Sequence, residues 1–427
     1  MHKKESWFLA GLLFAILWAS ASTATKIALK EAQPLVVAVS RFGVASVIML
    51  FTSHFILKNR LPRNEEWKQV FTESWRHMKY FFYDPGMHGY NWDSIRVKYE
   101  QLLPSVRHRK DLTYIIGEMI GELDAGHAYV TGGDMPKVKP VQIGLLGADL
   151  SFDSKANAYK IDKILNGQNW ENDLRSPLTE PGLNVKAGDY ILAIDGNNLN
   201  AQTNPYQFLI NKANKFVKLT VNSAPSLQGS REINIKTIDS EAELRYYDWV
   251  ENNRRKVDSM TNGKIGYIHI PDMSPSNGLN WFAKQFYPQV RKEGLIIDDR
   301  YNGGGNVSPM IIERLRRELV VAKVARNQES LMTNPDAVMT GPMVCLINEQ
   351  SMSDGDLFPY QFKTLGLGPV IGKRSWGGVV GIYGSLPLLD GSSVNRPEVA
   401  NFGADGTWIL EDVGMVPDIE VDNHPAK

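Results

Sequence analysis

Short apolar runs alternate with longer amphipathic runs in the C-terminal part of the chain, and this alternation restricts the fold more than any other feature. The apolar runs are typical of buried strands, and they lie at Ile265–Ile270, Leu295–Asp298, Met343–Ile347 and Pro369–Ile371. The helical patterns lie at Leu279–Lys292, at Pro309–Val320 and after Ser353. Strands joined through helices form right-handed crossovers and a largely parallel sheet. The sequence therefore predicts an α/β domain at residues 239–427.

Residues 1–62 contain two apolar runs that are each long enough to cross a membrane. Trp7–Thr25 carries no charge, and Leu35–Leu57 is interrupted only by one arginine and one histidine. A helix of this length spans the roughly 30 Å of a bilayer core. We expect a transmembrane hairpin, which would anchor the protein in the membrane through residues 7–57. Lysine and arginine are more frequent beside the two ends of the hairpin than in its turn, which favours a cytoplasmic location for the rest of the chain.

A secretory signal peptide is the alternative for the first run. Lys3 and Lys4 would form its charged beginning and Phe8–Trp18 its apolar centre, with cleavage near residues 19–24 and export of the mature protein. This alternative leaves Leu35–Leu57 without a function.

The hairpin pattern resembles the first two helices of drug/metabolite transporter superfamily proteins. The resemblance depends on the register of Trp18, Lys26, Pro34 and Arg41. Those proteins carry many more helices, so the resemblance implies a truncated or fused remnant that acts as an anchor and does not transport.

Residues 63–136 are predicted to form a small helical domain. Glu65–Phe82 and Trp92–Leu103 have helical patterns, and Asn91 is placed to cap the second helix. A third helix is indicated by apolar residues spaced three and four apart: Leu112, Ile115, Ile116, Met119, Ile120 and Leu123. The segment that follows this helix holds His127.

Residues 140–238 contain short strands separated by glycines and turn residues. The strand Tyr190–Ile194 precedes Asp195 and Gly196, a pair typical of a hairpin turn. The pattern Gly-Leu-x-x-x-x-Gly-Asp-x-Ile-Leu-x-Ile-Asp-Gly at residues 182–196 resembles a PDZ domain. This resemblance implies a substrate-binding loop that accepts peptide ends by strand addition, at Gly144, Leu145, Leu146 and Gly147. A β-barrel that serves only for packing remains the alternative.

Two of the predicted strands end in polar segments that contain glycines. Active sites of open α/β sheets lie at the carboxyl ends of strands, so the segments at residues 298–306 and 348–356 are candidates. The first contains three consecutive glycines, whose amides can approach a ligand closely. A phosphate-binding loop would continue with Gly-Lys-Ser/Thr, which is absent here, so an oxyanion-binding turn is the better functional interpretation. A simple tight turn is the alternative.

Ser353 lies in the second segment, between a strand and a helix. Backbone amides and the positive end of the helix dipole at such a position stabilise developing negative charge, as a nucleophile requires. Serine is also an ordinary N-cap residue, so helix capping is the alternative.

Three segments in one order resemble the tricorn protease branch of the tail-specific, C-terminal processing serine peptidases. They lie at residues 298–305, 348–360 and 372–378. The resemblance covers residues 66–427. It implies a helical layer, a PDZ domain and a crotonase-like catalytic domain, which together hydrolyse peptide bonds without a metal or another cofactor.

The resemblance also assigns roles to individual residues. It implies that Ser353 is the nucleophile, that His127 is the general base and that Glu411 orients the imidazole. It further implies an oxyanion hole formed by amides of the following residues: Asp354 and either Gly303 or Gly304. Gly126 stands where the family often has a serine. Gly378 stands where the Ser/Lys branch of the family would have its lysine, which makes His127 and Glu411 more necessary.

The predicted partners follow from these assignments and from the composition. Lysine and arginine number 47, as do aspartate and glutamate, so no net positive charge favours nucleic acid. The expected partners are a peptide or protein substrate and the membrane, and a homo-oligomer stays open. The main alternative function is that of a non-catalytic peptide- or ligand-binding protein on the same fold. A crotonase-like acyl-CoA enzyme would have no use for a PDZ domain.

Overall fold

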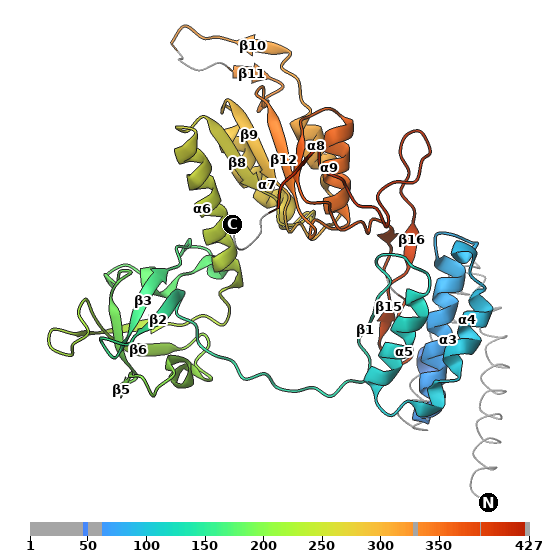
Figure 1. The fold of residues 1–427 in the computed structure, drawn as a ribbon, viewed down its shortest axis with the longest axis horizontal. Helices are drawn as coiled ribbons and strands as arrows, with labels where there is room; N and C mark the ends of the chain where they lie inside the picture. Colours follow the sequence, from blue (N-terminus) through green and yellow to red (C-terminus); the bar gives the residue numbers. More distant parts are fainter. Residues whose placement is uncertain (1–45, 50–61, 328–331, 385, 423–427) are drawn as a thin grey trace, which may run out of the picture. The chain divides into compact units, whose positions relative to one another are not determined.

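The computed structural model describes residues 46–49, 62–327, 332–384 and 386–422 (Figure 1). The chain divides into two units, residues 1–70 and 71–427. The predicted hairpin and its resemblance to transporter helices lie outside the described residues, apart from residues 46–49. Within the described ranges, no helix combines the length and the apolar character needed to cross a bilayer.

The helical region contains α3 (Arg63–Phe81), α4 (Trp92–Glu100) and α5 (Arg109–Gly121). The Asn91 side chain accepts a hydrogen bond from the Ser94 amide and so caps α4, as predicted. All six apolar residues that predicted the third helix are buried. Five of them share one face of α5, and burial of that face holds the helix in place, while Leu123 lies just beyond the helix end.

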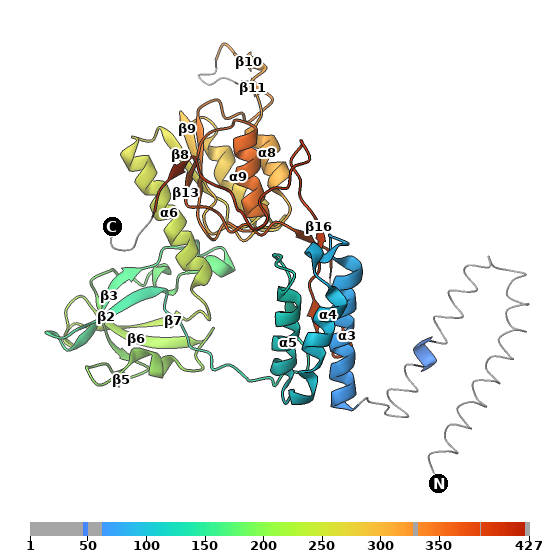
Figure 2. The same ribbon diagram turned by 45° about the vertical axis from the view of Figure 1, so that its right-hand side comes forward.

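Residues from the C-terminal part of the chain complete this helical region. Strand β1 (Val130–Thr131) pairs antiparallel with β15 (Ser393–Val394), and β14 (Gly381–Ile382) pairs with β16 (Pro397–Val399). Figures 1 and 2 show β16 beside the helices of this region. Such short pairs carry no periodic pattern, so the sequence did not predict them.

Residues 148–236 form an antiparallel sheet with the strand order β2-β3-β4-β6-β7, and β5 pairs with β4. Its strands are β2 (Ala148–Asp153), β3 (Ala158–Ile164), β4 (Tyr190–Ile194), β5 (Asn197–Asn198), β6 (Phe216–Asn222) and β7 (Arg231–Lys236). Strand β4 has the predicted bounds. Asp195 and Gly196 both have positive φ angles and form the predicted turn to β5.

A parallel sheet forms the core of the C-terminal region, as predicted. Its order is β17-β13-β12-β9-β8, and every neighbouring pair is parallel. Its strands are β8 (Ile265–His269), β9 (Gly294–Asp298), β12 (Met343–Ile347), β13 (Val370–Gly372) and β17 (Ile419–Glu420). A separate hairpin pairs β10 (Val321–Lys323) with β11 (Met332–Asn334).

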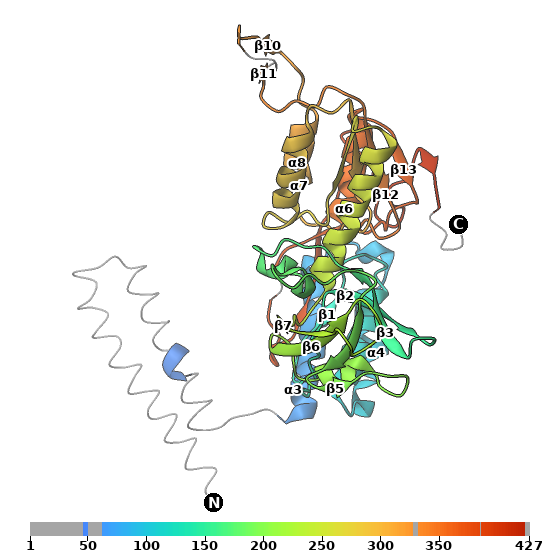
Figure 3. The same cartoon turned by 90° about the vertical axis from the view of Figure 1, so that its left-hand side faces the viewer.

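Four helices accompany the sheet: α6 (Ala242–Met260), α7 (Gly278–Phe286), α8 (Ser308–Leu315) and α9 (Asp354–Thr364). Helix α6 leads from the antiparallel sheet to the parallel sheet (Figures 1 and 3). The predicted helix at Pro309–Val320 is too long, because Leu319 and Val320 are exposed and gain nothing from a helical continuation. The helix predicted at Leu279–Lys292 ends early as well, and a short 3₁₀ turn follows it at Tyr287–Gln289.

Candidate active site

Ser353 lies in a strained turn between β12 and α9. Its backbone angles are φ 59° and ψ −118°, a combination that residues with a side chain rarely adopt. Although Ser353 occupies the N-cap position of α9, its side chain makes no capping hydrogen bond in the described structure. Helix capping therefore does not explain this serine, and its hydroxyl is available for chemistry.

The glycine turn that follows β9 lies directly against Ser353. Gly304 has a φ of +79°, and a Cβ atom on it would lie 2.6 Å from the Ser353 Cβ. The Asn302 carbonyl accepts a hydrogen bond from the Met352 amide at 2.9 Å, which joins the two turns. The meeting of these turns follows from the parallel order of β9 and β12, whose carboxyl ends lie side by side.

The three amides predicted for the oxyanion hole differ in their hydrogen bonds. The Asp354 amide, at the N-terminus of α9, donates no backbone hydrogen bond within the described part of the chain. The Gly303 amide donates to the Pro271 carbonyl at 3.0 Å, and the Gly304 amide donates to Asn302 Oδ1 at 2.9 Å. The turn would have to release one of these bonds before Gly303 or Gly304 could bind an oxyanion. Their catalytic role therefore stays a prediction.

His127 and Glu411 are brought together from distant parts of the sequence. The buried Glu411 carboxylate accepts hydrogen bonds from the amides of Gly126 (2.7 Å), Val379 (2.5 Å) and Val380 (2.8 Å). It thus binds the residue next to the histidine. The described structure contains no hydrogen bond from His127 Nδ1, and this buried atom has no partner. The predicted contact between Glu411 and the imidazole is not formed in this conformation.

The environment of His127 favours its neutral form. Burial lowers its pKa, and the negative charge of Glu411 partly opposes this shift. A general base must be unprotonated to accept a proton, so the lowered pKa suits such a role. The imidazole lies 5.5 Å from the Trp376 ring, and the Trp376 amide donates to the Ser351 carbonyl at 3.0 Å. His127 therefore neighbours the segment that contacts the Ser353 turn, although the described structure shows no hydrogen bond between His127 and Ser353.

Gly126 makes room for the buried Glu411 carboxylate and for the backbone of Gly378. A Cβ atom at Gly126 would lie 3.0 Å from both Glu411 Oε1 and the Gly378 Cα. A serine at this position would therefore require one of these groups to shift. The glycine that departs from the family pattern thus matches the close approach of Glu411 to the backbone beside His127.

The predicted peptide-binding loop already forms hydrogen bonds within the chain. The Gly144 amide donates to the Leu209 carbonyl and the Leu145 amide to the Ile238 carbonyl, both at 2.8 Å. The Gly147 amide donates to Glu241 Oε1, also at 2.8 Å, and Leu146 is buried. A peptide carboxylate would have to displace the Glu241 side chain to reach the Gly147 amide.

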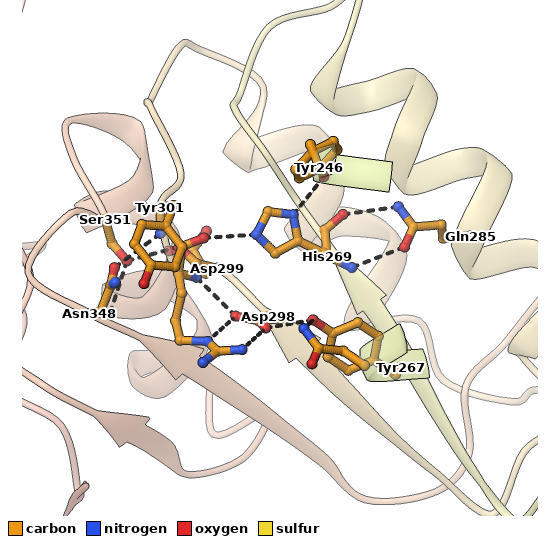
Figure 4. A network of polar contacts seen from close by, with 11 residues as sticks. Tyr246, Tyr267, His269, Gln285, Asp298, Asp299, Tyr301, Asn348 and Ser351 are labelled. Carbon is orange, nitrogen blue, oxygen red and sulfur yellow. Dashed lines mark hydrogen bonds and ion pairs between the residues drawn. The ribbon is translucent and has the colours of Figure 1, made fainter. Parts of the chain in front are cut away.

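Sequence reasoning missed a polar network behind the glycine turn, which Figure 4 shows. His269, at the end of β8, hydrogen-bonds through Nε2 to the Arg300 carbonyl at 2.8 Å and through Nδ1 to the Tyr246 hydroxyl at 2.7 Å. Because a carbonyl can only accept, Nε2 carries the proton and Nδ1 accepts from Tyr246. The Arg300 side chain binds the buried Asp298, which also accepts from the Tyr267 hydroxyl. These contacts fix the start of the turn that leads to Gly303.

Two buried carboxylates near the site were also missed. Asp299 and Asp356 each have one buried oxygen without a hydrogen-bond partner. Burial raises the pKa of Asp299 well above its ordinary value and that of Asp356 to about 6. Acidic residues beside a predicted strand end were the available signal, but the sequence does not show which of them are buried.

The chain is similar to known proteins over its described domains. Residues 63–121 match the family "Tricorn protease C1 domain", residues 144–240 match "Tricorn protease PDZ domain", and residues 264–421 match "Peptidase family S41". The S41 family and the relatives below indicate a serine-type peptidase domain.

Among its relatives, "Tricorn protease homolog 1" of Streptomyces coelicolor is 38% identical over 363 residues, which are 84% of this chain and 33% of the relative. "Tricorn protease" of Thermoplasma acidophilum is 35% identical over 362 residues, which are 85% of this chain and 33% of the relative. The solved structure titled "Crystal structure of the tricorn protease" matches with a TM-score of 0.79 at 35% identity, over 85% of this chain and 35% of the other. This chain thus spans about a third of the length of these relatives.

Proposed function

We propose that this chain hydrolyses peptide bonds through an acyl-enzyme formed on Ser353. The premise is that the chain belongs to the tricorn protease-like family and carries its PDZ and S41 domains. One observation carries the proposal. Ser353 lies in a strained turn at the N-terminus of α9, its side chain makes no capping hydrogen bond in the described structure, and it lies directly against Gly304. Its substrates are peptides or unfolded proteins, which the PDZ domain helps to bind.

The proposed mechanism uses three side chains and one backbone amide of this chain, together with a water molecule. Ser353 Oγ attacks the peptide carbonyl while His127 accepts its proton and then returns the proton to the leaving amine. The Asp354 amide stabilises the oxyanion, and water hydrolyses the acyl-enzyme. Glu411 stabilises the protonated imidazole. Catalytic hydrogen bonds often tighten only when substrate is bound, so the open geometry of Ser353 and His127 is compatible with this mechanism.

The nucleophile can be tested with a fluorophosphonate probe, which labels activated serines. We expect the protein to be labelled and Ser353→Ala to abolish the labelling while the fold is retained. Ser226→Ala, at an exposed serine of the PDZ domain, is the control and should be labelled like the wild type. Equal labelling of Ser353→Ala would reject the assignment. An unlabelled wild-type protein that still binds peptides would favour the non-catalytic alternative.

We further propose that residues 7–57 anchor the protein in the membrane, with the catalytic domain in the cytoplasm. The support is the pair of apolar runs in residues 1–62 and the excess of lysine and arginine beside their ends. Self-association into a homo-oligomer is a separate proposal. Sedimentation of the purified protein at several concentrations would detect it.

A further inference from the structure

The proposed nucleophile and the proposed base belong to separate segments of the chain. Ser353 precedes α9, whereas His127 lies against Trp376 and beside the residues that bind Glu411. The described structure shows no hydrogen bond between Ser353 and His127. Their separation must therefore be set by residues that contact both segments.

Asp356 is such a residue. Its amide donates to the Ser353 carbonyl at 2.8 Å, within the first turn of α9. Its Oδ1 accepts hydrogen bonds from Ser375 Oγ at 2.5 Å and from the Gly377 amide at 2.8 Å. These two donors flank Trp376 on both sides. The first turn of α9 thereby holds the tryptophan that neighbours His127.

The same contacts continue toward Glu411. Ser375 Oγ accepts a hydrogen bond from the Met415 amide at 2.7 Å, and the Ser375 amide donates to the Met415 carbonyl at 3.1 Å. Met415 follows Glu411 by four residues. A continuous series of hydrogen bonds therefore runs from the helix that begins after the nucleophile, through Ser375, to the loop that carries the proposed acid.

The burial of Asp356 is costly. Its side chain is fully buried, and its Oδ2 atom has no hydrogen-bond partner. Two hydrogen bonds to Oδ1 offset only part of the free-energy cost of burying this carboxylate, and an apolar side chain of similar size would often be less unfavourable. Packing alone therefore does not explain this residue, whereas the two hydrogen bonds to residues 375–377 do.

We propose that Asp356 is a positioning residue that sets the separation between Ser353 and the pair formed by His127 and Glu411. It does so by fixing residues 375–377 against the first turn of α9. This inference rests on the proposed peptidase function.

The test compares Asp356→Ala with Asp356→Asn. The alanine variant removes both accepted hydrogen bonds, and the asparagine variant keeps an acceptor oxygen in the same place. With fluorescently labelled unfolded casein, we expect Asp356→Ala to lower kcat by about a hundredfold, because misplaced catalytic groups have effects of this size, and to change KM by less than about threefold. Asp356→Asn should restore most of kcat. A merely structural role would not give this separation of kcat from KM together with rescue.

Asp418→Asn is the matched control. Asp418 also links α9 to a neighbouring segment, since it binds Lys363 at 2.5 Å and the Val370 amide at 2.9 Å, but at the other end of the helix. This variant should retain the kcat of the wild type. If Asp356→Ala does not fold, Ser375→Ala is the second test. It removes one of the two donors to Asp356, together with the acceptor of the Met415 amide, and should lower kcat by about tenfold.

A wild-type kcat in folded Asp356→Ala would overturn the inference. If Asp356→Ala does not fold, a wild-type kcat in Ser375→Ala would overturn it. An Asp356→Asn variant whose kcat is no higher than that of Asp356→Ala would also overturn it. Ser353→Ala is measured in parallel. Hydrolysis that persists in Ser353→Ala would overturn the proposed function itself. Hydrolysis that depends on Ser353 but not on Asp356 would overturn only the positioning role.

Discussion

Gly304 shows how one missing side chain shapes the candidate site. Its φ is positive, and a Cβ atom added to it would approach the Ser353 Cβ to 2.6 Å, so the turn has no room for an alanine. We expect Gly304→Ala to displace Ser353, to abolish most labelling by fluorophosphonate and to lower the free energy of unfolding by about 1 kcal/mol or more. Labelling rates and urea unfolding measure the two effects.

Gly121→Ala is the control for this substitution. A Cβ atom there meets no atom within 4 Å, and the φ angle is not positive. Labelling should stay at the level of the wild type. A Gly304→Ala variant that is labelled equally well would show that Ser353 does not depend on the turn.

Glu411 should control both the rate and its pH dependence. The carboxylate of Glu411 accepts three amide hydrogen bonds, and a glutamine amide group would face one of these donors with a donor of its own. We expect Glu411→Gln to lower kcat by about a hundredfold or more with a small change in KM. Wild-type turnover in this variant would mean that another group supports His127.

We expect the acidic limb of the rate profile to reflect the titration of His127, the proposed base. Its pKa lies below the ordinary 6.5, chiefly because of burial, so the neutral base persists to pH values below 6.5 and activity falls only as the pH drops further. Loss of the Glu411 charge removes the effect that raises this pKa. The acidic limb of Glu411→Gln should therefore move to still lower pH, as kcat/KM measured against pH would show. A shift to higher pH would contradict this account.

At the scale of elements, a buried ion pair joins α5 to the segment before β15. Arg109 Nε lies 2.5 Å from Asp390 Oδ2, and both side chains are almost completely buried. Removal of one partner leaves an uncompensated buried charge, so Asp390→Asn should lower the free energy of unfolding by about 3 kcal/mol. Denaturant unfolding measures this loss.

The exposed pair of Lys79 and Asp93 serves as the comparison. Asp93→Asn should change the free energy of unfolding by less than about 1 kcal/mol, because water screens an exposed pair. Equal effects of Asp390→Asn and Asp93→Asn would indicate that the contact between α5 and the C-terminal segment contributes little to stability.

Elements with a regular pattern could be predicted from the sequence. Apolar residues at every third or fourth position predicted α5, and β4 with its Asp195–Gly196 turn was predicted with its observed bounds. Helix ends were less accurate, as α8 shows, because apolar residues such as Leu319 can extend a pattern without being buried. The pairing of β1 with β15 was missed because each strand has only two residues.

At the scale of the whole molecule, the first 62 residues should decide where the protein is found. We expect the full chain to float with membranes in a density gradient, and a chain that starts at residue 63 to remain in the soluble fraction. A soluble full-length chain would contradict the anchor. A mature N-terminus near residue 24 would instead favour signal-peptide cleavage and export.

The sequence alone predicted four of the five strands of the parallel sheet and the PDZ hairpin, and it located Ser353 between a strand and a helix, whereas β17 was not predicted. These features depend on local periodicity and local turn chemistry, which neighbouring residues encode. Only the tertiary structure showed that Glu411 lies beside Gly126 and that Asp356 binds residues 375–377. It also showed that the amides of Gly303 and Gly304 already donate hydrogen bonds within the chain. Those contacts depend on how distant segments pack against each other, and no short stretch of sequence contains that information.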